Sequence, residues 1–212
     1  MPRIEWREFE PYNPLDEDEL AASVQRALEA RPLEPVPPDH FRGAGLYAFY
    51  YFGDFAPYQP IVEDEVPIYI GRAAAGAGRH GSGGRSVARL LDRIRQHSRS
   101  IEAAENLDLA DFCVRFLVTA DAWIVLGEHS LLSAYHPVLW NTVVDGFGNK
   151  AQGKGRDEQV RSKWDTLHPG REAPKVLRPN PLGFDGVANL VNDALAARAR
   201  GEHVEVDVQD ED

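Results

Sequence analysis

The sequence predicts a mixed α/β fold of the α+β type, in which a small sheet is flanked by helices. Three short segments rich in β-branched and aromatic residues are typical of strands, and they cover residues 46–52, 66–70 and 112–118. Other segments place apolar residues at helical spacing. With 212 residues, of which 43% are hydrophobic, the chain can bury one substantial core. We therefore expect one globular unit.

The composition excludes several classes of protein. One cysteine, Cys113, cannot form an internal disulfide, and the seven histidines show no zinc-finger spacing with it. No apolar run approaches the roughly 20 residues needed to cross a bilayer. Residues 1–10 carry acids instead of the basic and then apolar pattern of a secretion signal. We expect a soluble, cytoplasmic protein without a membrane partner.

The first helix is expected from Asp16 or Asp18 to Ala30, after an irregular arm. It ends before a proline-rich stretch, and its apolar residues share one face: Leu20, Val24, Ala27 and Leu28. The strands over 46–52 and 66–70 then suggest a hairpin with a long connection. The composition of that connection, residues 53–65, suits a surface insertion.

A glycine-rich segment, residues 71–84, leads into a helix expected over 86–99. It lacks the lysine that a phosphate-binding P-loop requires, so an ATP or GTP site is not expected. One helix face is apolar, with Val87, Leu90, Leu91 and Ile94. A basic stripe follows at four-residue spacing, formed by Arg85, Arg89, Arg93 and His97. Arg93 and His97 fall where the buried face meets solvent.

The third strand, 112–118, alternates apolar and other residues, and a further helix runs from about Asp121 to Pro137. Glu128 lies in the middle of its apolar stripe, between Ile124 and Leu131. A buried carboxylate must meet a cation, accept hydrogen bonds or become protonated. The alternative is a slight helix rotation that brings Glu128 to water.

Beyond Pro137, Trp140 and Asn141 are expected on an irregular exit. The glycine-rich, basic stretch 145–163 is typical of a mobile loop that becomes ordered on a partner, and the acidic residues from 201 onward are typical of disorder. The expected division is an N-terminal arm and helix over 1–42, a core over 43–146, a basic loop region over 147–184, and a C-terminal helix with an acidic tail over 185–212.

Charge is strongly segregated along a chain whose net charge is −11. Residues 71–100 hold seven arginines against one aspartate, and residues 148–178 hold eight basic residues against four acids. These basic islands favour polyanion binding, and the alternative is ordinary solvated surface. The candidate contacts to a nucleic acid are Arg72, Arg79, Arg85, Arg89, Asn149, Lys150, Gln152, Lys154 and Arg156.

Two tripeptides on the first two predicted strands, Gly45-Leu46-Tyr47 and Tyr69-Ile70-Gly71, resemble the signature of GIY-YIG nucleases. Arg93, His97, Glu128 and Asn141 follow in the order that this family uses. The sequence departs from the simplest pattern in having Leu46 for isoleucine and a long insert between the tripeptides. These departures weaken identification with the small homing and repair modules.

The insert, the N-terminal helix and the stretches ENLDLADF and DGFGNKAQGKGR are instead similar to the restriction enzymes of this superfamily that cut CCGCGG. This resemblance covers residues 10–171. It implies a three-stranded antiparallel sheet, a homodimer and double-stranded DNA as substrate. A cognate DNA methyltransferase would be a functional and not a physical partner.

The same resemblance implies an active site formed by Tyr47, Tyr69, Arg93, His97, Glu128 and Asn141. Glu128 would hold one Mg²⁺, for which Mn²⁺ could substitute, and Arg93 would pair with the scissile phosphate. Tyr47 would orient or deprotonate the attacking water with His97 or Tyr69 assisting, and Asn141 would position the phosphate or a tyrosine hydroxyl. Two alternatives stay open, a repair or homing nuclease and a catalytically silent DNA-binding module.

Overall fold

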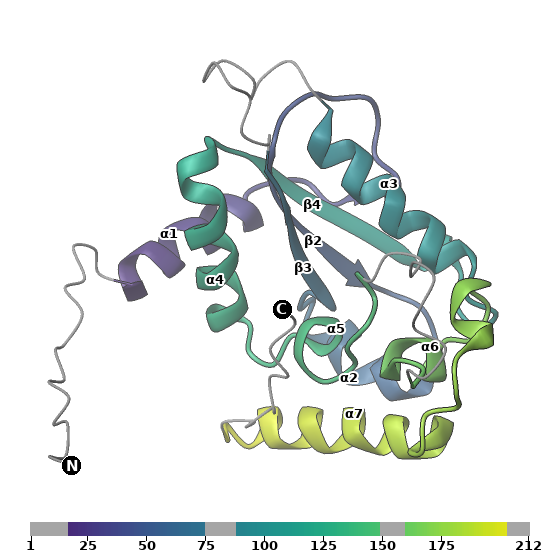
Figure 1. Cartoon of the computed structure of the whole chain (residues 1–212). Helices are drawn as coiled ribbons and strands as arrows, with labels where there is room; N and C mark the ends of the chain where they lie inside the picture. Colours follow the sequence, from purple (N-terminus) through teal and green to yellow (C-terminus); the bar gives the residue numbers. More distant parts are fainter. Residues whose placement is uncertain (1–16, 75–87, 149–159, 203–212) are drawn as a thin grey trace, which may run out of the picture.

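The computed structural model describes residues 17–74, 88–148 and 160–202 (Figure 1). The strands are β1 (Glu34–Pro35), β2 (Gly45–Tyr51), β3 (Tyr69–Ala73) and β4 (Phe112–Val118). The α-helices are α1 (Glu17–Glu29), α2 (Gln59–Glu63), α3 (Arg89–Glu102), α4 (Ile124–Ala134), α5 (Leu139–Thr142), α6 (Lys163–Leu167) and α7 (Gly183–Ala199). Short 3₁₀ helices are η1 (Ala56–Tyr58), η2 (Leu109–Asp111), η3 (Asp121–Trp123) and η4 (Ala173–Val176).

One antiparallel sheet with the strand order β1-β4-β2-β3 forms the centre of the fold. The small antiparallel sheet flanked by helices is therefore confirmed, with the two-residue strand β1 added at one edge. The third strand has the predicted bounds. The second predicted strand, which is β3 in the structure, begins at Tyr69 and not at Val66. Its register with β2 sets Tyr47 opposite Gly71.

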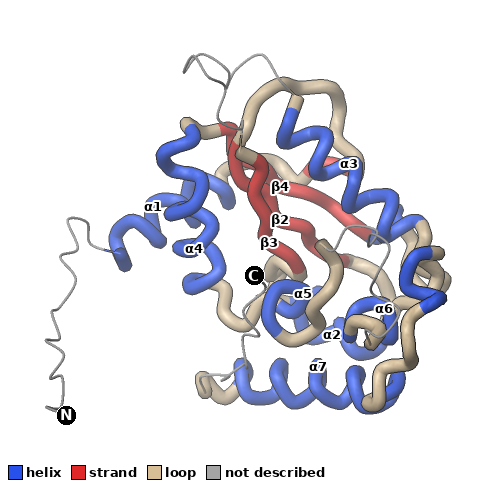
Figure 2. The backbone as a smooth tube through the Cα atoms, in the orientation of Figure 1, coloured by secondary structure: helices blue, strands red, loops and turns tan. Residues whose placement is uncertain are grey.

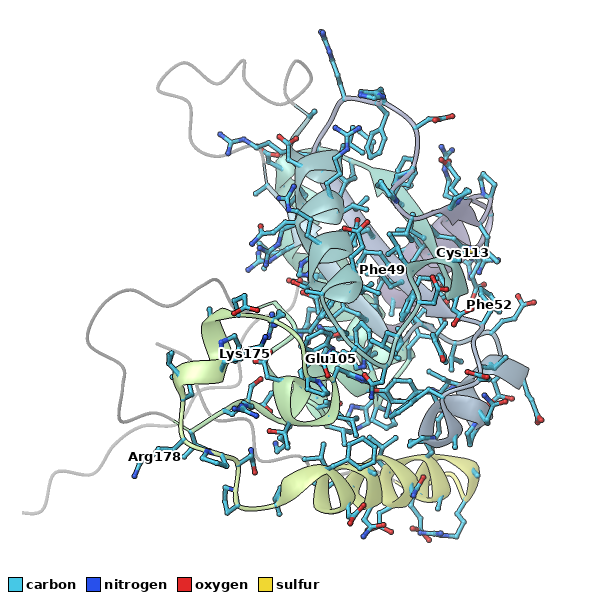
Figure 3. All side chains as sticks on the ribbon, turned by 90° about the vertical axis from the view of Figure 1, so that its right-hand side faces the viewer. Phe49, Phe52, Glu105, Cys113, Lys175 and Arg178 are labelled. Carbon is cyan, nitrogen blue, oxygen red and sulfur yellow. The ribbon has the colours of Figure 1, made fainter. Side chains whose placement is uncertain are left out.

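Helices cover both faces of the sheet, with α3 on one side and α1 and α4 on the other (Figures 1 and 2). Tyr47 of β2 faces α3, where its ring centroid lies 5.8 Å from that of His97. The neighbouring Leu46 faces α4, since a Cβ placed on Gly127 would meet Leu46 Cδ1 at 2.7 Å. Every residue of β2 is buried, as expected for a central strand covered on both faces.

The three long helices predicted from periodicity are present. The first matches its predicted range closely, and α3 presents Leu90, Leu91 and Ile94 to the core as expected. In the described structure α3 begins at Arg89, whereas the predicted start, Ser86, lies outside the described ranges. Within the described ranges, no helix is both long and apolar enough to traverse a lipid bilayer.

Two local expectations were wrong. The connection 53–65 is not a plain surface loop, because it contains η1 and α2 and buries Tyr58 and Ile61. The ring of Tyr58 packs against that of Tyr51 on β2, with centroids 5.6 Å apart, and the ring of Phe55 meets that of Phe184 on α7, with centroids 6.3 Å apart. Trp140 and Asn141 form the short helix α5 in place of an irregular exit. Its backbone is held by a hydrogen bond from Trp140 N to Ile68 O.

A buried polar chain ties α5 and α6 to the 53–65 segment. Trp140 Nε1 donates to the Tyr58 hydroxyl at 2.8 Å, and that hydroxyl donates to His168 Nε2 at 2.6 Å. His168 Nδ1 lies 3.0 Å from Asn106 Oδ1, and Asn106 Nδ2 donates to Leu167 O. Because Asn106 Nδ2 donates to Leu167 O, Asn106 Oδ1 faces His168 and accepts from its Nδ1, which leaves Nε2 of the neutral ring to accept the Tyr58 proton. This pattern requires a neutral imidazole that carries its proton on Nδ1.

Burial lowers the pKa of His168 to about 3, against 6.5 for an exposed histidine. The unfolded chain takes up this proton near pH 6.5, whereas the native protein does not until about pH 3. The contribution to stability is therefore complete above pH 6.5 and falls with acidification, by up to about 1.4 kcal/mol per pH unit. We expect urea unfolding between pH 8 and pH 5.5 to show this loss, and His168→Gln to reduce the slope. An unchanged slope would contradict the neutral, buried imidazole.

Candidate active site

Tyr47 is the central residue of the site. It lies on the central strand and is 0% exposed, and its hydroxyl has no hydrogen-bond partner among the described residues. Burial raises the pKa of Tyr47 well above its ordinary value, and the neighbouring Tyr69 adds to this effect while the Arg93 guanidinium opposes it. A buried hydroxyl without a partner is costly in a core. Such a group is typical of a site that is completed by a ligand.

Gly71 and Gly45, the glycines of the two tripeptides, each lie where a neighbouring group leaves no room for a Cβ atom. A Cβ on Gly71 would meet the Tyr47 hydroxyl oxygen at 2.5 Å, so the tyrosine ring lies directly over the glycine on the adjacent strand. Gly45 has a φ of 156°, and a Cβ there would collide with the Leu117 carbonyl of β4. Any larger residue at Gly71 would displace Tyr47.

Tyr69 and His97 complete an aromatic cluster with Tyr47 and Phe147. The ring of His97 is 5.1 Å from that of Tyr69 and stacks on Phe147 at 4.6 Å and 26°. His97 is 1% exposed, and its Nε2 has no partner among the described residues. Burial, together with the Arg93 and Arg171 guanidiniums, lowers its pKa to about 3. His97 is therefore a neutral imidazole with an available nitrogen.

Arg93 lies on α3 one turn before His97 and is only partly buried. Its Nη1 donates to Gln96 Oε1 at 3.0 Å. A Cβ on Gly148 would lie 3.6 Å from Arg93 Nη2, 3.3 Å from the Tyr69 hydroxyl and 3.8 Å from His97 Cε1. The guanidinium, the hydroxyl and the imidazole therefore converge on the backbone at Gly148.

Glu128 enters the site from α4, on the other side of strand β3. Its Oε2 pairs with Arg72 Nε at 2.6 Å, and the two side chains are 21% and 42% exposed, respectively. Burial raises the pKa of the Glu128 carboxyl, while Arg72 and Arg93 act in the opposite direction. Glu128 is thus only partly buried, which lies between the inward position and the rotation toward water that the sequence left open, and the cation that it meets is Arg72. Strand β3 thus carries both Tyr69 of the aromatic cluster and Arg72, the partner of Glu128.

Asn141 does not contact a tyrosine hydroxyl in the described structure. Its Oδ1 accepts from Ile70 N and its Nδ2 donates to Ile70 O, both at 2.8 Å. These two bonds satisfy the outer edge of β3 between the tyrosine and the glycine of the second tripeptide. Asn141 thus holds the strand that carries Tyr69.

Of the predicted DNA contacts, Arg72 and Arg89 lie within the described residues. Arg89 is exposed at the start of α3, and Arg72 pairs with Glu128. The others lie outside the described ranges: Arg79, Arg85, Asn149, Lys150, Gln152, Lys154 and Arg156.

Sequence reasoning missed Gln96, Phe147 and Gly148 as neighbours of the site. Gln96 carries no signal in the sequence beyond its position three residues after Arg93 on the same helix. Phe147 is the one aromatic residue in a glycine-rich basic stretch, which is a feature that could have suggested a packed anchor. Its partner, His97, is distant in sequence, so no local pattern links them.

Together these groups can neutralise and align a phosphate and bind a water near a buried hydroxyl. The comparison with known families agrees with this chemistry, since the family model described as the Eco29kI GIY-YIG domain matches residues 39–195. No curated protein matches the chain. Because the family match spans well over half of the sequence, the chain belongs to the Eco29kI-type GIY-YIG family of restriction endonucleases.

Proposed function

We propose that this nuclease hydrolyses phosphodiester bonds in both strands of a short GC-rich palindrome, CCGCGG, as a Mg²⁺-dependent homodimer. The family assignment supports a restriction-type DNA endonuclease. One observation carries the chemistry, namely the buried Tyr47 hydroxyl, which forms no hydrogen bond of good geometry among the described residues and lies close to the Tyr69 hydroxyl and the Arg93 guanidinium. The attacking water and the scissile phosphate supply the partners that these groups need.

In the proposed reaction, Arg93 pairs with the scissile phosphate and stabilises the charge that develops on its oxygens. Tyr47 orients the attacking water or, as a phenolate, takes its proton, with His97 or Tyr69 assisting. Because burial raises the pKa of Tyr47, it can act as a base only when added cations lower that pKa. The neutral His97 has one nitrogen that donates and one that accepts, and its available Nε2 can form a hydrogen bond within the same cluster.

The residues of the site fit a magnesium ion. Among the described residues, no group of three His, Cys, Asp or Glu side chains is placed to enclose a metal. Mg²⁺ needs only one or two carboxylates and keeps several waters, and substrate phosphate oxygens commonly complete its shell. Glu128 is the carboxylate that would hold it. When bound, Mg²⁺ would act as a Lewis acid on the phosphate and lower the pKa of nearby water.

The ion pair with Arg72 gives a test of this assignment. Removing the Arg72 charge frees the Glu128 carboxylate and removes a repulsive cation, so Arg72→Gln should bind metal about threefold to tenfold more tightly without DNA. Titration with Mn²⁺, followed by electron paramagnetic resonance, measures this affinity. Arg89→Gln removes an exposed charge at the start of α3 and should leave the affinity unchanged. Equal affinities in all three proteins would contradict the role of Glu128.

The dimer and the palindrome rest mainly on the resemblance to the enzymes that cut CCGCGG, and an argument from symmetry supports them. One active site per chain can cut one strand at a time, and two chains related by a two-fold axis place one site on each strand. A target with the same symmetry is then required. Arginine pairs bidentately with guanine in the major groove, so an arginine-rich chain suits a GC-rich target.

Digestion of a fully sequenced plasmid with and without Mg²⁺, followed by mapping of the ends, tests the proposal. We expect metal-dependent double-strand breaks at CCGCGG and sedimentation as a dimer on a cognate duplex. Ends at asymmetric or structure-dependent sites, or a monomer on the duplex, would support a repair or homing nuclease instead. Binding without cleavage in Mg²⁺ would indicate a silent DNA-binding module.

A further inference from the structure

Arg171 lies outside the family's signature residues, yet it is built into a dense set of contacts beside the site. Its side chain is 13% exposed and forms a two-pronged pair with Asp165, with Nε–Oδ1 at 2.6 Å and Nη2–Oδ2 at 2.7 Å. The guanidinium also lies over the ring of Trp164, 4.5 Å from its centroid. These contacts fix the guanidinium from two sides.

The remaining donors of Arg171 reach a different segment of the chain. Nη2 donates to the carbonyl of Gly146 at 2.9 Å, and Nη1 donates to that of Phe147 at 3.2 Å. Two consecutive backbone carbonyls are thus held by one guanidinium. The Asp165 carboxylate is in turn oriented by the Ser162 hydroxyl, which donates to its Oδ2 at 2.6 Å.

The backbone that Arg171 holds leads directly into the active site. Phe147 stacks on His97 and meets the ring of Tyr69 edge-on, with centroids 4.9 Å apart. The next residue, Gly148, is the point on which Arg93, Tyr69 and His97 converge. The charge of Arg171 also contributes to the low pKa of His97.

We propose that Arg171, oriented by Asp165, is a positioning residue for the reaction, which holds Phe147 and Gly148 so that His97 and Arg93 keep their working geometry. This inference rests on the proposed function. It assigns Arg171 to the interior scaffold of the site, although it belongs to a basic stretch in which a DNA contact would be the simpler expectation. A DNA contact would need an accessible guanidinium, whereas this one is nearly enclosed and four of its five N–H groups already donate to Asp165, Gly146 and Phe147.

The test combines Arg171→Gln and Arg171→Lys with a spectroscopic measurement on the free protein. In the wild type, the Phe147 ring should shift the His97 Cε1 proton resonance upfield, and His97→Gln identifies that resonance. Both Arg171 variants should lose this shift and lower kcat about tenfold to a hundredfold, with KM for DNA changed less than about threefold. Lysine keeps the charge but cannot bridge Asp165 and two carbonyls. Recovery of kcat in Arg171→Lys would therefore overturn the proposal.

Arg115→Gln is the matched control. Arg115 also lies over an aromatic ring, that of Tyr50, at 4.9 Å, and donates to a backbone carbonyl, that of Arg31, at 3.1 Å. It is on the α1 and α4 side of the sheet, so its loss should cost comparable stability without changing the His97 resonance or kcat. A variant Phe147→Leu, which keeps the Arg171 contacts, should reproduce the loss of the shift and of kcat.

The outcomes separate this inference from the proposed function. If the wild type fails to cut DNA in Mg²⁺, the proposed function is wrong, and the resonance still reports whether Arg171 positions Phe147 against His97. If both Arg171 variants keep the shift and the full kcat, the positioning role is wrong whatever the substrate. A large rise in KM with unchanged kcat would assign Arg171 to DNA binding and would also overturn the inference.

Discussion

Glu128→Gln should reduce DNA cleavage by at least about a thousandfold while the protein folds and binds DNA as before. Gln has the same shape and keeps an oxygen that can accept from Arg72, so the contact at the edge of β3 can persist. What is lost is the negative charge that would hold the metal. Single-turnover cleavage in Mg²⁺, with DNA affinity measured in Ca²⁺, separates chemistry from binding.

Glu29→Gln is the control for this experiment. Glu29 is another carboxylate at the α1 and α4 side of the sheet, and its Oε1 accepts from the Tyr135 hydroxyl at 2.6 Å. Its substitution disturbs a comparable hydrogen bond away from the site and should leave cleavage unchanged. Cleavage by Glu128→Gln within about tenfold of the wild type, a difference of about 1.4 kcal/mol, would show that Glu128 is not the metal ligand.

Most substitutions in a protein core lower stability. Tyr47→Phe should instead leave stability intact and lower cleavage. The ring keeps its packing, and the lost hydroxyl is one that has no partner in the described structure. Removing a buried, unpaired polar group should leave the free energy of unfolding unchanged or raise it by about 1 kcal/mol. Cleavage should nevertheless fall about a hundredfold to ten-thousandfold, because water would lose its orienting or accepting group.

Strand β2 offers the control, since Tyr50 also has a buried hydroxyl without a partner among the described residues. Tyr50 lies near Arg115, on the face opposite to Tyr47. Tyr50→Phe should change stability in the same direction and leave cleavage intact. Equal cleavage by Tyr47→Phe and Tyr50→Phe would remove Tyr47 from the mechanism. Urea unfolding and single-turnover kinetics on both variants measure the two effects.

The helices and strands that carry Tyr47, Arg93, His97 and Glu128 were predictable because each one is encoded by a local period. Position on a period also indicated that Glu128 would lie on the apolar face of its helix and that it would need a cation, hydrogen bonds or a proton there. The identity of that cation was not predictable, since Arg72 reaches Glu128 only through the register of β3 against β2. In the sequence, Arg72 had the features of a DNA contact.

The missed features depend on contacts between distant segments. Tyr58 and His168 are separated by 110 positions, and Asn141 holds a strand 71 positions earlier. Nothing in the connection 53–65 or in the residues around Trp140 repeats at a helical or strand period over enough residues to indicate burial. Their partners are set by the packed tertiary structure, to which a local pattern is insensitive.

The central strand β2 restricts which parts of the site can move. Because β2 is paired with β3 on one edge and β4 on the other, and all its residues are buried, its amide hydrogens should exchange with solvent only when the whole molecule opens. Tyr47 is therefore held by the most slowly opening part of the protein. Adjustment to a bound duplex would be left to the groups around it, among them Arg72 and Arg93, whose side chains reach solvent from an edge strand and a helix.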